Sequence, residues 1–274
     1  MKIKFLGTAA YEAFPAIGCS CAACKRAWQS GGRNLRSRTQ ALVNDDLLID
    51  FPEDSVWHFM ANKIDYDKIK TCLITHSHSD HLSEYTLEAL GPSYTKSARA
   101  DKIAFYAAKA GYEKINDVVM ETRLKERADA NLVTSYVPFN INGYDVLPVA
   151  AKHDESASPV NYRIEKGGKS IFYGHDTGYP FEQTFDALKA KGRLDLITLD
   201  CTGGILKGYK DHHLCAEVAM EIFDRLKQMG VIDDKTIKVL NHFSHNGLAT
   251  YDDMLEEVKG TDVVISYDGM EIEF

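Results

Sequence analysis

Three histidines and one aspartate lie within six residues of one another, at His76, His78, Asp80 and His81. They directly follow the apolar residues 72–74, which we expect to form a buried strand. Imidazole and carboxylate groups are the ligands that zinc, manganese and iron ions prefer. Because alternate side chains of an extended segment face the same way, His76 and His78 are expected at one metal ion. Asp80 and His81 are then expected at a second ion, so the motif predicts a dinuclear metal site.

Two metal ions need about six to eight ligands, and the motif supplies four. The others should be His, Asp or Glu side chains at the ends of later strands, where loops position chemistry on a rigid scaffold. Three residues lie within a few positions of the end of an apolar run: His153, Asp176 and His242. Asp50 also ends an apolar run. It either fixes a ligand imidazole or caps a helix that begins near residue 55.

A second cluster, Cys19, Cys21 and Cys24, has the spacing C-x-C-x-x-C. Three thiolates this close are typical of zinc binding, and tetrahedral zinc requires a fourth ligand. We expect His245, three residues beyond His242, to supply it, with Cys215 as the alternative. Four protein ligands leave no open position, so this zinc would be structural. Free thiols or a transient disulfide are the competing interpretation.

Composition restricts the class of protein. The chain has 274 residues, of which 45% are hydrophobic, so a sizeable core is expected. No run of about 18 apolar residues and no signal peptide is present, so we expect a cytoplasmic protein outside the membrane. A net charge of −8 argues against long nucleic acid as a partner. It does not exclude a small anionic substrate, because a metal site brings its own positive charge.

These residues must be positioned by an α+β framework. Strands are expected at residues 2–6, 41–49, 70–75, 102–106, 132–139, 144–150, 160–165, 170–173, 194–199, 236–240, 263–265 and 270–274. Helices are expected at residues 55–62, 82–90, 181–191, 214–229 and 251–259, and hairpin turns at 142–143 and 167–168. Residues 101–130 are the least regular and are interpreted as an insertion over the site. This order predicts two sheets packed face to face with helices outside, in a single domain over residues 1–274.

The H-x-H-x-D-H pattern at residues 76–81 resembles the signature of the metallo-β-lactamase superfamily. The resemblance implies a four-layer αβ/βα sandwich. It also implies that His76, His78 and His153 hold one ion and that Asp80, His81 and His242 hold the other. Asp176 would bridge the two ions.

Other segments resemble the PhnP branch of that superfamily, the cyclic phosphodiesterases of the carbon–phosphorus lyase pathway. They are residues 6–8, 18–24, 176–177, 200–201, 242–245 and 268–272, so the resemblance spans nearly the whole chain. It implies a structural zinc, a dinuclear site that often holds manganese, a homodimer, and hydrolysis of phosphodiesters such as 5-phosphoribosyl 1,2-cyclic phosphate. It also implies a phosphate-contacting histidine before the penultimate helix, here His213, with His212 as the alternative. Residues 82–131 have no obvious match and are expected to wall the substrate pocket.

The expected reaction is metal-assisted hydrolysis of a small phosphodiester. Two metal ions would lower the pKa of a bridging water, and the resulting hydroxide would attack phosphorus. Asp80 would act through its metal, and His213 would contact the phosphoryl oxygen or protonate the leaving group. The alternatives are a thioesterase or lactonase on the same scaffold, or a non-hydrolytic di-iron redox module. The acidic charge argues against an RNA-processing nuclease.

Overall fold

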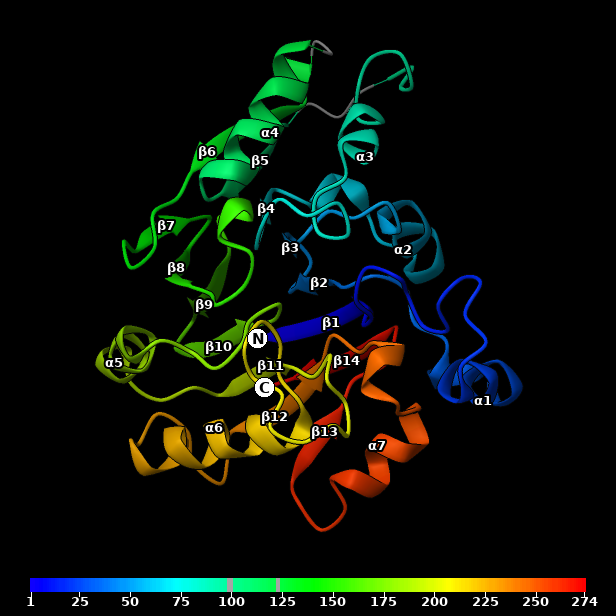
Figure 1. Cartoon of the computed structure of the whole chain (residues 1–274). Helices are drawn as coiled ribbons and strands as arrows, with labels where there is room; N and C mark the ends of the chain where they lie inside the picture. The colour runs from blue at the N-terminus through cyan, green and yellow to red at the C-terminus, as the bar shows by residue number, and fades with distance from the viewer. Residues whose placement is uncertain (98–100, 122–123) are drawn as a thin grey trace.

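The computed structural model describes residues 1–97, 101–121 and 124–274 (Figure 1). Within these residues, two seven-stranded sheets pack against each other, and helices cover the outer face of each sheet. The predicted αβ/βα sandwich of the α+β class is therefore confirmed. No helix in the described ranges is long and apolar enough to cross a membrane.

The first sheet has the strand order β14-β1-β2-β3-β4-β5-β6. Its strands are β1 (Lys2–Gly7), β2 (Gln40–Val43), β3 (Leu47–Ile49), β4 (Thr71–Leu73), β5 (Ile103–Ala107), β6 (Ala128–Leu132) and β14 (Met270–Glu273). Strands β3 to β6 run parallel to one another. The helices α2 (Ser55–Asn62), α3 (Glu84–Glu88) and α4 (Lys109–Glu121) supply apolar side chains to the cluster on its outer face.

The second sheet has the order β13-β12-β11-β10-β9-β8-β7. Its strands are β7 (Phe139–Ile141), β8 (Tyr144–Ala150), β9 (Val160–Lys166), β10 (Lys169–Gly174), β11 (Leu196–Asp200), β12 (Ile237–Asn241) and β13 (Val263–Ile265). Strands β10 to β13 are parallel. The helices α5 (Glu182–Lys191), α6 (Ala216–Gln228) and α7 (Tyr251–Glu257) cover this sheet, on the opposite side of the molecule from α4 (Figure 1).

The inner faces of the two sheets form the central core. Phe5 and Leu73 of the first sheet and Tyr162 and Tyr173 of the second are fully buried there. Burial of side chains of this size is the main source of folding free energy, and truncating one to alanine typically costs about 3–5 kcal/mol. The last strand, β14, pairs with β1, so the two ends of the chain lie side by side (Figure 1).

Three sequence predictions about the elements are wrong. Residues 41–49 form not one strand but the β2–β3 hairpin, which turns at Asn44 with φ of 51°. Residues 132–139 are mostly loop, because β6 ends at Leu132 and β7 begins at Phe139. Residues 101–130 are not an insertion over the site, because β5 and β6 extend the first sheet and α4 packs on its outer face. Positions 122–123 of that stretch lie outside the described residues.

Candidate metal centres

The candidate ligands lie where strands of the two sheets end. Residues 76–81 follow β4, Asp176 follows β10 and His242 follows β12. β10, β11 and β12 are neighbours that run parallel, so their carboxyl ends meet at one edge of the second sheet. This topology explains why Asp176 and His242 share one site although 66 positions separate them in the sequence.

His76, His78 and His153 form the first group. Nε2 of His76 lies 3.0 Å from Nδ1 of His78, and Nε2 of His153 lies 3.4 Å from the same atom. One nitrogen from each ring lies within 4.8 Å of the others, so the three can hold one metal ion.

Asp80, His81, Asp176 and His242 form the second group, with ligand atoms again within 4.8 Å of one another. Oδ2 of Asp176 lies 2.6 Å from Nε2 of His81 and 3.3 Å from Nε2 of His242. The same oxygen lies 3.4 Å from Nε2 of His76, which belongs to the first group. Asp176 therefore stands between the two groups, where a bridging carboxylate would stand.

Two buried ring nitrogens indicate that a cation belongs here. Among the described residues, Nε2 of His81 and Nε2 of His242 make no hydrogen bond of acceptable geometry. Buried polar atoms in folded proteins are nearly always paired. Both nitrogens converge on the Asp176 carboxylate, and imidazole with carboxylate is a donor set that suits zinc, manganese or iron. The residues present therefore fit a pair of divalent metal ions.

The electrostatics of the cluster are dominated by these contacts. Burial alone would lower the pKa of His81, but the carboxylates of Asp50, Asp80 and Asp176 hold it well above its ordinary value. Burial would raise the pKa of Asp176, but His242 and His81 hold it well below its usual range. Burial and the neighbouring His81 lower the pKa of His76. Such strongly perturbed groups in one cavity are typical of a functional site.

Asp50 fixes the orientation of His81. Its Oδ2 lies 2.7 Å from Nδ1 of His81, and its Oδ1 accepts a hydrogen bond from the amide of Thr75 at 2.8 Å. The carboxylate thereby leaves Nε2 of His81 facing the metal cluster. The alternative role as a helix cap is wrong, because the residue before α2 is Asp54.

Asp200 and Thr202 hold His242 and were not identified from the sequence. Oδ2 of Asp200 lies 3.2 Å from Nδ1 of His242, and Oγ1 of Thr202 lies 2.8 Å from the same nitrogen. Although Asp200 can be grouped with ligands by distance, its oxygens already accept from the amides of Leu214 and Asp176 and from Thr202. We therefore regard it as the carboxylate that orients His242. The sequence signal that could have identified Asp200 is its position at the end of β11.

The structure distinguishes His213 from His212. Nδ1 of His213 lies 3.1 Å from Oδ1 of Asp176 and 3.3 Å from Oδ2 of Asp200. His212 is exposed; its backbone oxygen lies 3.2 Å from Nδ1 of His153, and its ring lies edge-on to that of His153 with 6.4 Å between the centroids. Of the two candidates, His213 is the one beside the metal cluster.

A cavity of about 510 Å³ opens over both groups. Its walls come from the loop after β1, the loop between β11 and α6, and the segment after β12. The residues concerned are Ala10, Tyr11, Glu12, Thr202, Gly203, Leu206, Tyr209, His213, Ser244 and Asn246. No described residue of the segment 82–131 lines the cavity, so the expectation that this segment walls the pocket is wrong. Positions 98–100 and 122–123 lie outside the described residues.

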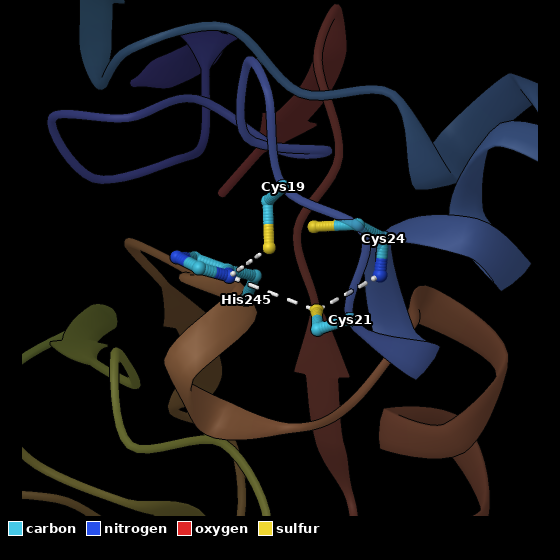
Figure 2. A group of neighbouring side chains, drawn as sticks. All are labelled: Cys19, Cys21, Cys24 and His245. Carbon is cyan, nitrogen blue, oxygen red and sulfur yellow. Dashed lines mark hydrogen bonds between the residues drawn. The ribbon is translucent and has the colours of Figure 1, made fainter.

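The side chains of the cysteine cluster and His245 point toward one another (Figure 2). Nδ1 of His245 lies 3.3 Å from Sγ of Cys19 and 3.7 Å from Sγ of Cys21, and Cys24 completes the group. The predicted fourth partner, His245, is therefore in place, and the rival Cys215 is not a member of this group. Because Sγ of Cys21 accepts from the amide of Cys24 at the start of α1 (Ala22–Ser30), its pKa falls to about 6. A thiolate is thus favoured, as zinc requires.

The family model of the β-lactamase superfamily domain matches residues 50–243, which is most of the chain. The protein therefore belongs to this superfamily. It is thus a hydrolase of the metallo-β-lactamase fold. No curated protein matches the chain.

Solved structures with a similar fold include three proteins of different kinds. A diphosphatase from the PhnP family has a TM-score of 0.76 at 21% identity, over 100% of this chain and 97% of that one. Zn²⁺-bound PqqB from Methylobacterium extorquens has a TM-score of 0.77 at 18% identity, over 100% of both chains. Human tRNase Z, short form, has a TM-score of 0.67 at 16% identity, over 100% of this chain and 99% of that one. At these identities the likeness establishes the fold alone.

Proposed function

We propose that this protein is a metal-dependent phosphodiesterase of the PhnP-like branch, acting on a small phosphodiester. The observation that carries the proposal is the place of His213, on the cavity wall beside Asp176. A cationic imidazole next to a dinuclear metal site suits a phosphoryl group, which is already anionic before attack, whereas the carbonyl of a thioester or lactone is neutral in the ground state.

The charge on His213 follows from its neighbours. Burial would lower its pKa, but Asp200 and Asp176 raise the pKa to about 11. These contacts favour the protonated ring, with Nδ1 donating toward the two carboxylates. In the described part of the chain Nε2 has no hydrogen-bond partner, which leaves this N–H for a phosphoryl oxygen or for the leaving group.

The metal ligands in this proposal are His76, His78, His153, Asp80, His81, His242 and the bridging Asp176. Bound there, two divalent ions would supply activated water and neutralise charge on the phosphoryl oxygens. The chain itself orients the ligands through Asp50 and Asp200 and presents His213 to the substrate. Cys19, Cys21, Cys24 and His245 would hold a structural zinc, which the full set of four protein ligands supports.

The likeness to a PhnP-family diphosphatase supports a phosphoryl substrate. The absence of a basic arm and the net charge of −8 favour a small substrate over long nucleic acid. The test is a substrate panel offered to the manganese-loaded protein: ribose 1,2-cyclic phosphate, an acyl thioester and a lactone. We expect turnover of the cyclic phosphate, with kcat/KM at least about 100-fold above the other two. Preferential turnover of the thioester or lactone would replace the proposal with the thioesterase or lactonase alternative.

A further inference from the structure

Glu12 lies in the cavity wall, on the loop between β1 and α1. The backbone of this loop pairs with the segment that carries the ligand His242. The amide of Ala10 donates to the oxygen of Phe243 at 2.9 Å, and the amide of Phe243 donates to the oxygen of Thr8 at 2.8 Å. The loop is therefore anchored next to the dinuclear site.

One oxygen of the Glu12 carboxylate is held in place by two neighbours. Oε1 accepts a short hydrogen bond from Oγ of Ser244 and lies 3.6 Å from Nε2 of His245. The other nitrogen of His245, Nδ1, faces Cys19 and Cys21. A carboxylate behind a metal-binding imidazole fixes the ring and is fixed by it in return. The cysteine site and the wall of the active-site cavity are thus joined through Glu12.

The second oxygen of the same carboxylate is free. Within the described residues, Oε2 of Glu12 has no hydrogen-bond or ion-pair partner, and 26% of the side chain is exposed. A carboxylate that only oriented His245 would need one oxygen. An ionised carboxylate with a free oxygen is a pure acceptor, so it binds hydroxyl and amine donors and repels other anions.

We propose that Glu12 is a specificity-determining residue that receives the part of the substrate attached to the phosphodiester. Its free Oε2 accepts a hydrogen bond from a hydroxyl of that part, as a sugar would supply. Its charge disfavours a second anionic group at the same place. This inference rests on the proposed function, because it assumes that the phosphoryl group occupies the metal site.

Calorimetric binding of three probes to the manganese-loaded protein tests the inference. The probes are inorganic phosphate, ribose 5-phosphate and ribose 1,5-bisphosphate. In Glu12→Gln, we expect the affinity for the bisphosphate relative to ribose 5-phosphate to rise about tenfold, with inorganic phosphate unchanged. Glu53→Gln removes one charge from an exposed glutamate outside the cavity and should change none of the three affinities.

Zinc content and a second variant separate specificity from a purely structural role. Glu12→Asp keeps the charge but shortens the reach toward His245, so it should preserve the discrimination even if zinc per chain falls. The inference would be overturned if the affinities for all three probes changed equally. It would also be overturned if the affinity ratio of the bisphosphate to ribose 5-phosphate followed the zinc content of the variants and not the charge at position 12. Failure of every probe to bind the wild-type protein would overturn it as well.

Turnover is measured separately, so the two ideas can fail separately. If Glu12→Gln shifts the affinity ratio of the bisphosphate to ribose 5-phosphate in a protein that hydrolyses no phosphodiester, the role of Glu12 is supported and the proposed function is rejected. If the protein hydrolyses a phosphodiester and the affinity ratio is unchanged, the proposed function is supported and the role of Glu12 is rejected.

Discussion

The substitution Asp50→Asn tests whether a buried carboxylate sets the metal affinity of the site. Asp50 is fully buried and lies 2.7 Å from Nδ1 of His81. Asparagine can still accept from Thr75, but it then presents its NH₂ group to His81. The imidazole must respond by accepting at Nδ1 and carrying its proton at Nε2, the nitrogen that lies 2.6 Å from Asp176. A protonated nitrogen cannot bind a metal, so the ligand is lost without loss of the ring.

Removing such an orienting partner typically weakens metal affinity by about 10–100-fold, or about 1.4–2.7 kcal/mol. Competition for zinc with a chromophoric chelator would measure this, together with metal content per chain. We expect one of the two active-site ions to be weakened and the cysteine-site zinc to be retained. Affinities within about twofold of wild type at every site would refute the reasoning.

Asp268→Asn is the matched control. Asp268 is a half-buried acid that accepts from Thr8 at 2.6 Å and from the amide of Ser37 at 2.6 Å, and neither is a proposed ligand. Loss of these bonds should lower stability by about 1–3 kcal/mol and leave metal affinity unchanged. Equal loss of metal in both variants would mean that general destabilisation explains the result.

His213→Ala should lower kcat about 10²–10⁴-fold, whereas His212→Ala should stay near wild type; equal rates in a steady-state assay would contradict the assignment. Cys21→Ser should remove one zinc per chain and lower Tm, and unchanged values of both would show that the cysteine site is not a zinc site. Burial lowers the pKa of His58 to about 4, from 6.5 when unfolded, so the neutral ring stabilises the fold above pH 6.5. That contribution, up to about 3 kcal/mol, is lost as the pH falls toward 4. In denaturant titrations, the free energy of unfolding of His58→Gln should depend less steeply on pH than that of the wild-type protein. The same pH dependence in both proteins would exclude His58 as its origin.

The positions of the candidate ligands could be predicted because strand ends carry them. Apolar runs are visible in a sequence, and a polar residue within a few positions of the end of such a run, as at Asp176 and His242, is expected at a sheet edge. The same rule applied to Asp200 would have placed it there too. What it does there was not visible, because its partners His213 and His242 approach only through folding.

The cavity walls could not be predicted for a related reason. Glu12 meets Ser244 across 232 positions of the chain, and no local pattern records that contact. The β2–β3 hairpin was missed although the sequence carries a turn signal there, because Asn44, Asp45 and Asp46 separate two apolar strands that were interpreted as one. Local patterns thus predict strands, their ends and this turn, whereas tertiary contacts decide the lining of the site.

The most direct test of the central claim is hydrolysis of ribose 1,2-cyclic phosphate by the manganese-loaded protein, with His76→Ala measured in parallel. Metal content per chain is determined for both proteins. The account predicts turnover by the wild-type protein and loss of one active-site ion and nearly all activity in His76→Ala. Equal activity in the two proteins, or no turnover by a wild-type protein shown to hold both ions, would contradict it.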